Sequence, residues 1–214
     1  MTDSYFEIRL CKSCGLRYPV LKDAPNSGRC PICLGESAAV LRKNFREDER
    51  VLIRSTGKHP PSRAVLLDNI RSAWNVGSIL RSADGLGFDP VYLCGITATP
   101  DNEAVRKTSL GAEDHLTWSY HKDAVKLALD LKNDGWQIIS IEEGEGSKPL
   151  GADTIRIQGK WALVLGSEVT GVDPDLLSLS DEVLSIPMRG HKRSLNVAIA
   201  FSIAAFTLKA EHSE

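Results

Sequence analysis

The 214 residues of the chain leave room for one medium domain and a small appendage, because single cores seldom grow beyond about 250 residues. Hydrophobic residues (42%) and charged residues (25%) occur in ordinary proportion, and no window approaches the eighteen or so uncharged apolar residues of a membrane helix, which excludes a membrane-spanning protein. The net charge of −2 hides an asymmetry, since residues 1–63 hold twelve Lys and Arg against seven Asp and Glu, and residues 64–214 hold fourteen against twenty-one.

The N-terminal sequence does not have the pattern of a secretory signal. Residues 1–5 lack both a basic start and an apolar segment, so we expect a cytoplasmic protein without disulfides. The positive charge of residues 1–63 is typical of a module that binds a polyanion. A solvated linker explains it equally well, because residues 42–63 alone hold seven of the basic side chains.

Four cysteines near the start have the spacing of a metal site. Cys11-x2-Cys14 and Cys30-x2-Cys33 are separated by fifteen residues, and such pairs can direct four thiolates at one tetrahedral ion. A disulfide pair, a redox Cys-x-x-Cys and an iron–sulfur site are the alternatives. The expected compartment weighs against the first and the duplication against the second. We therefore interpret residues 1–41 as a zinc-ribbon-like module with a structural zinc.

Residues 42–61 are predicted to be a basic linker. They mix basic and acidic side chains, and Pro60-Pro61 enforces an extended exit from the segment. The second domain is therefore expected to occupy residues 62–214.

From residue 62 onward, apolar runs alternate with helical patterns. Runs such as Ala162–Leu165 have no polar alternation, which is typical of strands covered on both faces of a parallel sheet. Cys94 lies in one of these runs and is interpreted as a core residue. Strands are predicted at 64–68, 91–94, 115–119, 137–141, 162–165 and 182–186, and helices at 76–86, 122–133 and 195–208. This order predicts an α/β domain with a mostly parallel sheet.

The loop after the first predicted strand holds several unusual residues. We place Asn75 at a helix N-cap and Gly77 where the backbone is approached closely. Arg81 lies among apolar residues of the same helix, so it is expected to have an anionic partner, either a ligand or a structural salt bridge. Trp74 is interpreted as a core residue in preference to a platform for base stacking.

Two further loops follow the fifth and sixth predicted strands. In residues 166–171 two glycines bracket Glu168, as they also would in an ordinary turn. Residues 186–188 lead through a basic loop into a helix that we expect Ser194 to cap. Asn196, inside an apolar helix start, is costly unless its amide has a partner. Since ligands collect at the carboxyl ends of parallel strands, the three loops are expected to form one site.

Together these motifs resemble the SpoU family of the SPOUT superfamily, a group of trefoil-knotted RNA methyltransferases. The resemblance covers residues 64–209. It rests on Asn75-Val-Gly77 with Arg81, Thr108-Ser-Leu-Gly-Ala112, Gly166-Ser-Glu168 with Gly171, Ile186-Pro-Met188 and Ser194-Leu-Asn196-Val, which stand in family-like order. It implies helices on both faces of the sheet, a C-terminal trefoil knot and a homodimer whose active site joins two subunits. It also implies transfer of a methyl group from S-adenosylmethionine to ribose 2′-hydroxyls.

The resemblance assigns roles to individual residues. The cofactor would be lined, largely through backbone groups, by Leu165, Gly166, Ile186, Met188 and Leu195. The reaction site would comprise Asn75, Arg81, Glu168, Ser194 and Asn196. Because a guanidinium stays protonated, we assign Arg81 to fixing an RNA phosphate and stabilising the charge that develops on the attacking oxygen. Glu168 would orient Asn75 or Arg81.

The predicted function is methylation of a ribose 2′-hydroxyl in structured RNA, either tRNA or rRNA, with the zinc ribbon and its linker docking on the RNA. Members of the family often carry a ribosomal-protein-like domain, or nothing, in front of the knot, so the ribbon leaves the substrate open. One alternative is a non-catalytic RNA-binding or assembly factor that keeps the knotted fold. Another is a ribbon that docks on a protein.

Overall fold

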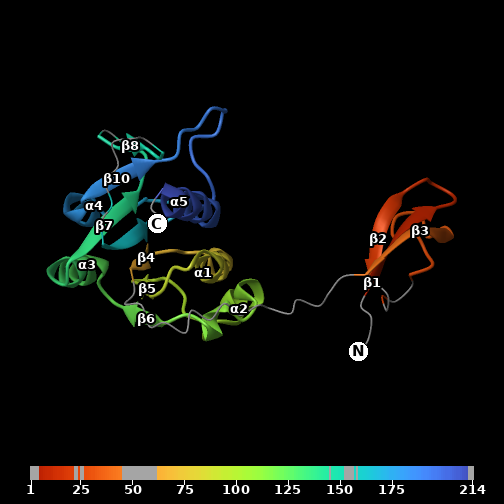
Figure 1. The fold of residues 1–214 in the computed structure, drawn as a ribbon, viewed down its shortest axis with the longest axis horizontal. Coiled ribbons are helices and arrows are strands. Elements are labelled where there is room, and N and C mark those ends of the chain that lie inside the picture. Colours follow the sequence, from red (N-terminus) through yellow and green to blue (C-terminus); the bar gives the residue numbers. More distant parts are fainter. Residues whose placement is uncertain are drawn as a thin grey trace. The chain divides into compact units, whose positions relative to one another are not determined.

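The structure, a computed structural model, describes residues 5–21, 24, 27–44, 62–144, 146–151, 157 and 159–211. The chain divides into two compact units, Met1–Lys58 and His59–Glu214, whose elements are labelled in Figure 1. Most of the predicted linker, residues 45–61, lies outside the described residues. None of the described helices is long and apolar enough to cross a membrane.

The N-terminal unit contains a three-stranded antiparallel sheet in the order β2-β1-β3. Its strands are β1 (Tyr5–Cys11), β2 (Arg17–Leu21) and β3 (Ser37–Asn44). Strand β3 continues three residues past the predicted end of the ribbon, because its last residues still pair with β1. Arg42 on β3 donates to Glu7 Oε1 on β1 at 2.8 Å and lies over the Tyr5 ring, which holds this end of the pair together.

The C-terminal unit contains a seven-stranded sheet in the order β6-β5-β4-β9-β7-β10-β8, and all its pairings are parallel. The strands are β4 (Arg63–Asp68), β5 (Val91–Cys94), β6 (Trp118–His121), β7 (Trp136–Ile141), β8 (Lys148–Pro149), β9 (Lys160–Leu165) and β10 (Glu182–Ser185). Strands β4, β9 and β7 lie in the middle, and their residues are almost continuously buried. The carboxyl ends of β7, β9 and β10 therefore lie side by side.

Helices cover both faces of this sheet (Figure 1). One face carries α1 (Ala73–Leu86) and α5 (Val197–Glu211), with α2 (Glu103–Ser109) against α1 and the short 3₁₀ turn η1 (Ala112–Asp114) after it. The other face carries α3 (Ala124–Asn133) and α4 (Pro174–Leu179). The prediction of an α/β domain with a mostly parallel sheet and helices on both faces is confirmed.

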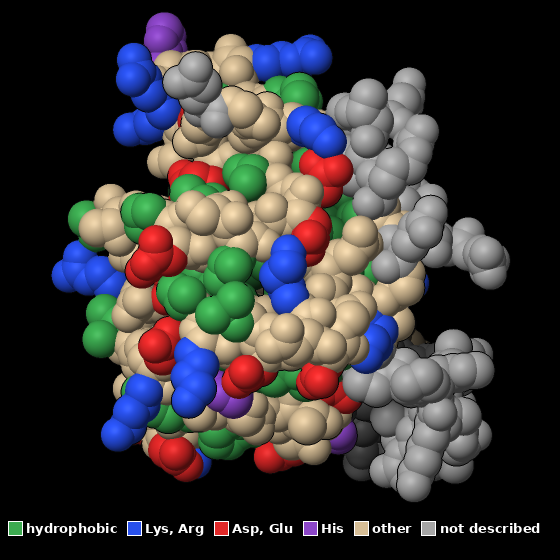
Figure 2. Space-filling model, turned by 90° about the vertical axis from the view of Figure 1, so that its left-hand side faces the viewer, with side chains coloured by type: hydrophobic (Ala, Val, Ile, Leu, Met, Phe, Trp, Pro, Cys, Tyr) green, Lys and Arg blue, Asp and Glu red, His purple; other side chains and the backbone are tan. Residues whose placement is uncertain are grey.

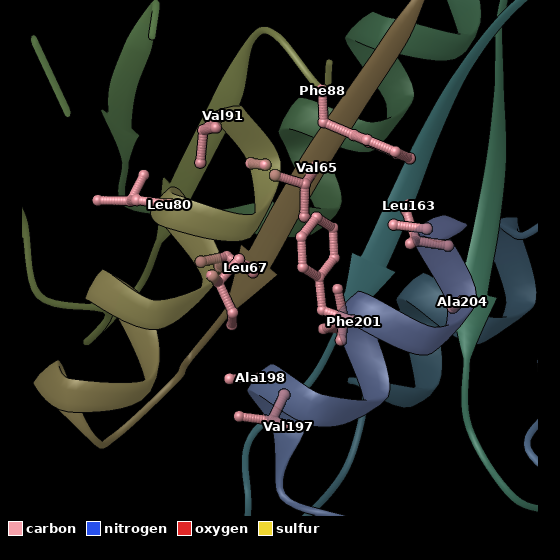
Figure 3. Close-up of a cluster of buried hydrophobic side chains, with 14 of the residues drawn as sticks. Val65, Leu67, Leu80, Phe88, Val91, Leu163, Val197, Ala198, Phe201 and Ala204 are labelled. Carbon is pink, nitrogen blue, oxygen red and sulfur yellow. The ribbon is translucent and has the colours of Figure 1, made fainter. Parts of the chain in front are cut away.

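Two apolar cores separate the three layers. In the first, Phe88 meets the rings of Trp161 and Phe201 edge-on, at centroid distances of 5.2 and 5.5 Å. Figure 3 shows Phe201 of α5 between residues of β4 and β9. In the second core, residues of α3 and α4 such as Leu176 pack on the opposite face. Cys94 is fully buried there, and burial raises the pKa of its thiol to about 12, which confirms its interpretation as a core residue.

Five of the six predicted strands match observed strands to within about two residues. The strand predicted at 115–119 instead begins at Trp118, because Ala112–Asp114 form a turn and Thr117 N–H is held by Asp89 Oδ1 at 2.9 Å. Helices α2 and α4 and strand β8 were not predicted.

The outer surface over α3 and α4 shows no broad patch of one charge among the described residues. Figure 2 views this side of the molecule, where Lys and Arg side chains are interspersed with Asp and Glu. Such an alternation is typical of a solvated face and gives a polyanion no continuous track.

Candidate active site

A cavity of about 620 Å³ opens at the carboxyl ends of β7, β9 and β10 and at the start of α5. All five residues predicted to contact the cofactor line it: Leu165, Gly166, Ile186, Met188 and Leu195. Glu168, Ser194 and Asn196 from the predicted reaction site line it as well. The loops after β9 and β10, which lie apart in the sequence, therefore form one cavity.

The turn after β9 is closed so tightly that only glycine fits at position 166. A Cβ on Gly166 would lie 2.2 Å from the carbonyl carbon of Gly171 and from the nitrogen of Val172. The Gly171 N–H donates to the Ser167 carbonyl at 2.9 Å, and Gly171 adopts a φ of 74°, which favours glycine. The two glycines thus fix the backbone that presents Glu168.

Sequence reasoning missed a second carboxylate in this cavity, Glu142, which directly follows β7. Its Oε2 accepts from the Val172 N–H at 2.8 Å, and its Oε1 accepts from the Glu143 N–H at 3.2 Å. A Cβ on Gly171 would collide with this carboxylate. Glu142 therefore anchors the turn after β9 from the neighbouring strand. Its place at the carboxyl end of a central strand was the signal that could have identified it.

Glu168 accepts three hydrogen bonds from the start of α1. Its Oε2 accepts from Arg71 N–H at 2.8 Å, and its Oε1 accepts from Ser72 N–H at 3.1 Å and from Asn75 Nδ2 at 2.9 Å. Partial burial works to raise the pKa of Glu168, but these hydrogen bonds outweigh it and leave the pKa below its ordinary value. Glu168 is therefore ionised at neutral pH and orients Asn75, one of its two predicted partners.

Asn196 extends this network to α5. Its Nδ2 donates to Asn75 Oδ1 at 2.9 Å, while its own Oδ1 accepts from Ala198 N–H at 2.9 Å. Since an ionised Glu168 can only accept, the Asn75 amide must turn its nitrogen to Glu168 and its oxygen to Asn196. The predicted need of the Asn196 amide for a partner is confirmed.

Two predicted helix caps are wrong. Helix α1 is capped by Ser72, whose hydroxyl accepts from Asn75 N–H, so Asn75 lies in the first turn with its side chain free to reach Glu168. Helix α5 begins at Val197 and is capped by Asn196, not by Ser194. Ser194 is exposed at the cavity instead. Both errors arise because several capping residue types stand close together before each helix.

Arg81 lies outside this cavity. It lines a separate depression of about 540 Å³ together with Ser78, Ser82, Lys107, Thr108 and Leu110. Arg81 follows Asn75 by six residues, which rotates its direction about the axis of α1 by roughly 240° beyond one full turn. The side chains of Asn75 and Arg81 therefore leave the helix in different directions. Arg81 is exposed and has no ion pair among the described residues, so the expected structural partner is not found. The core interpretation of Trp74 is also wrong, because this side chain is 59% exposed.

Gly77 does permit a close approach, but of another helix. A Cβ at this position would lie 2.1 Å from Thr108 Oγ1 and 2.2 Å from the Val105 carbonyl oxygen of α2. The glycine therefore holds α1 and α2 in backbone contact.

In the N-terminal unit, the four predicted metal ligands come together. The sulfur atoms of Cys11, Cys14, Cys30 and Cys33 all lie within 4.8 Å of one another, with Cys11 and Cys33 3.4 Å apart and Cys14 and Cys30 3.7 Å apart. The Cys14 N–H donates to Cys11 Sγ and contributes most to lowering the pKa of that thiol to about 6, which favours the thiolate. Four sulfurs so arranged fit the chemistry of a tetrahedral thiolate site.

Comparison with known proteins identifies the C-terminal unit. The SpoU rRNA Methylase family matches residues 62–206. A Staphylococcus aureus (strain MSSA476) protein assigned to the TrmH family of tRNA/rRNA methyltransferases is 28% identical over 174 residues, which are 80% of this chain and 68% of that protein.

Solved structures share the fold. An RNA methyltransferase of the TrmH family from Porphyromonas gingivalis is 29% identical with a TM-score of 0.64, and the match covers 71% of this chain and 60% of that one. An AdoMet-bound rRNA methyltransferase from Sinorhizobium meliloti, 24% identical, gives a TM-score of 0.65 over 72% of this chain and 57% of that one, which shows the fold alone. This chain thus spans less than two thirds of either protein. The trefoil knot is implied by the shared fold. Because the family match extends over more than half of its residues, the chain belongs to the SpoU rRNA methylase family.

Proposed function

We propose that the protein transfers a methyl group from S-adenosylmethionine to a ribose 2′-hydroxyl of tRNA or rRNA. The observation that carries this proposal is the hydrogen-bonded series Glu168–Asn75–Asn196 beside a cavity of about 620 Å³ built from the loops after β7, β9 and β10. It combines an ionised carboxylate, two oriented amides and a cavity of the size that small cofactors occupy.

The residues of the cavity fit S-adenosylmethionine. Leu165, Ile186, Met188 and Leu195 supply apolar surface for an adenosine moiety, and the backbone around Gly166 can approach the ligand closely. Glu142 and Glu168 are carboxylates that suit a cationic ligand. When bound, the cofactor supplies an electrophilic methyl group on a sulfonium.

The chain's own residues then position the RNA beside the cavity and stabilise the charge that develops on the attacking oxygen. Glu168 fixes Asn75, and Asn75 fixes Asn196, so that polar groups at the mouth of the cavity are held in one arrangement before RNA binds. Ser194 adds an exposed hydroxyl at the same edge. The ribose 2′-hydroxyl would accept the methyl group that the cofactor supplies and would release its proton to an RNA phosphate or to water. The Arg81 guanidinium binds the phosphate and stabilises the developing oxyanion.

This role requires a second copy of the chain, because Arg81 does not line the cavity of its own copy. We propose a homodimer in which Arg81 of one copy serves the cavity of the other. Helix α5 offers an apolar face for this contact: Ile199, Ile203 and Phe206 follow at helical spacing and are 52%, 38% and 65% exposed. The hydroxyl oxygens of Ser202 on α5 and Ser82, next to Arg81, lie 3.0 Å apart, so α5 and the Arg81 region of α1 lie together.

We further propose that Cys11, Cys14, Cys30 and Cys33 hold a structural zinc and that the ribbon docks on RNA. Three exposed cations of this unit, Arg17, Arg29 and Lys43, have no ion pair among the described residues. Such unpaired cations can bind phosphates.

Mapping of ribose methylation in total RNA from cells with and without the gene tests the proposal. The expected result is the loss of 2′-O-methylation at one or a few nucleotides when the gene is removed, and its return with the wild-type gene. Identical maps would refute the proposal. The second candidate, a non-catalytic RNA-binding or assembly factor, has no observation in its favour beyond the fold, and it predicts identical maps.

A further inference from the structure

The depression that Arg81 lines is a separate feature from the cofactor cavity. It has a volume of about 540 Å³ and lies between the exposed side of α1 and the second half of α2. Its described lining consists of two cations, three hydroxyl side chains and Leu110, with no carboxylate among these residues. In a unit with an excess of acidic residues, two cations that line the same depression favour an anionic ligand.

Neither cation is strongly held by a partner. Among the described residues Arg81 has no ion pair. Lys107 meets Glu103 at 2.9 Å one helical turn away, but both side chains are more than half exposed, at 59% and 76%. Such an exposed pair on one helix is weak and is readily exchanged for a better ligand. Both charges are therefore available to an incoming anion.

The depression is preformed. Gly77 brings α1 against the backbone of α2, as described above, and two hydroxyls join the helices further. Ser78 Oγ and Thr108 Oγ1 both donate to the Trp74 carbonyl, at 2.9 and 3.1 Å. Arg81 lies one turn beyond Ser78 on α1, and Lys107 immediately precedes Thr108 on α2. Two rigid helices thus hold the two cations beside one depression, which lowers the cost of ordering them on a ligand.

We infer that Lys107 and Arg81 together form a subsite for a phosphodiester of the RNA backbone, in which Lys107 is a positioning residue. The inference rests on the proposed function and adds a residue to it. A guanidinium can bind two phosphate oxygens side by side, while an ammonium contributes a point charge from a second direction. Phosphate held here would lie against the guanidinium that stabilises the reaction.

The neighbouring residue provides a matched control. Arg106 is also exposed on α2 and carries the same charge, but it does not line the depression. Lys107→Ala and Arg106→Ala therefore remove one positive charge each from adjacent positions. Glu103→Ala breaks the ion pair of Lys107 while leaving the lysine in place, and Lys107→Arg keeps the charge.

Three assays test the inference. The KM for RNA and kcat come from methyl transfer from labelled S-adenosylmethionine into total RNA from cells lacking the gene. Calorimetry gives the cofactor affinity, and filter binding of the same RNA at several salt concentrations gives the salt dependence of RNA binding, the salt slope. Lys107→Ala should raise the KM for RNA roughly fivefold and reduce the salt slope by about one phosphate contact, while cofactor affinity stays within about twofold. Arg106→Ala and Glu103→Ala should neither raise the KM for RNA nor reduce the salt slope. Lys107→Arg should keep the KM for RNA and the salt slope near their wild-type values.

Equal effects of Lys107→Ala and Arg106→Ala on KM and salt slope would overturn the inference while leaving the proposed function intact. An increase in KM with Glu103→Ala equal to that with Lys107→Ala would overturn it too, because the ion pair and not the subsite would then be responsible. If the wild-type protein neither binds cofactor nor transfers methyl groups, the proposed function fails. The salt slope of RNA binding then still decides whether Lys107 contacts phosphate.

Discussion

The side chains of Asn75 and Asn196 are joined by a hydrogen bond of 2.9 Å although 121 residues separate them in the sequence. Asn75 belongs to the first turn of α1, and Asn196 caps α5. Because Glu168 holds Asn75 from the turn after β9, three loops depend on one another through three side chains. A change at the start of α5 is therefore expected to alter the proposed reaction site as well.

Two substitutions at Asn196 separate capping from the network. Asn196→Ala removes both functions, so the free energy of unfolding should fall by about 1 kcal/mol or more, and methyl transfer should be lost. Asn196→Asp keeps an oxygen for the Ala198 N–H but faces Asn75 Oδ1 without a donor. Urea unfolding should find this variant closer to the wild type in stability, while kcat should remain at least tenfold low. Wild-type kcat in Asn196→Asp would show that the Asn75 contact has no part in the reaction.

The pH dependence of stability tests the ionised state of Glu168. Its pKa is lowered in the folded protein from an ordinary value of 4.5, so its contribution is complete above that value and is lost as the pH falls through the folded pKa. At neutral pH Glu168→Gln should be less stable than the wild type by up to about 1 kcal/mol, because Glu168 is exposed and solvent screens its charge. The difference should shrink below about pH 4.5. A Glu168→Gln difference that grows towards acid would contradict the assignment.

Gly166→Ala tests the shape of the cofactor cavity. The new Cβ would meet the backbone of Gly171 and Val172 at 2.2 Å, so the turn must move. Calorimetry should show a loss of S-adenosylmethionine affinity of at least tenfold. Gly190→Ala, where a Cβ has open space, should bind the cofactor normally. Equal affinity in both variants would place the cofactor elsewhere.

The proposed zinc site of the N-terminal unit can be disrupted without changing a residue that lines the cavity. Cys30→Ser should lose bound zinc, measured by elemental analysis, and the signals of residues 5–44 in an NMR spectrum should collapse, because so small a unit depends on its metal for folding. Cofactor binding should persist. Cys94→Ala, which alters a buried thiol of the second unit, should keep the full metal content. Wild-type zinc content in Cys30→Ser would refute the four-thiolate site.

Mixing two inactive variants tests the shared active site. Arg81→Ala and Asn196→Ala should each abolish methyl transfer, but in a mixed dimer one cavity would combine an intact Asn196 with an intact Arg81 from the other copy. After co-expression or subunit exchange, activity should return to about a quarter of the wild-type level, because half of the dimers are mixed and each has one complete site. No recovery in a demonstrated mixed dimer would mean that both residues act within one copy.

The strands of the second domain could be predicted because runs such as Ala162–Leu165 are apolar without alternation, and a parallel sheet buries such runs on both faces. The position of the cavity could be predicted for the same reason, since motifs that follow parallel strands must meet at one edge. The sulfur cluster followed from cysteine spacing alone.

Other features depend on three-dimensional neighbours that no local pattern reveals. The caps at Ser72 and Asn196 were misplaced because Asn75 and Ser194 are equally suitable residue types. Glu142 was missed because its partner, the Val172 N–H, belongs to a distant turn. The exposure of Trp74 was misjudged because burial preference is an average over many proteins, whereas the described neighbours of this position on α1 leave more than half of the side chain exposed.

The central claim is methyl transfer to a ribose hydroxyl, and the most direct test is to identify the methylated product. The purified protein would be incubated with methyl-labelled S-adenosylmethionine and total RNA from cells lacking the gene, and the RNA would then be digested to nucleosides and separated. We predict that the label is recovered in a 2′-O-methylnucleoside and that Asn196→Ala abolishes it. Label in a base-methylated nucleoside, or no label at all from a protein that binds the cofactor, would contradict the account.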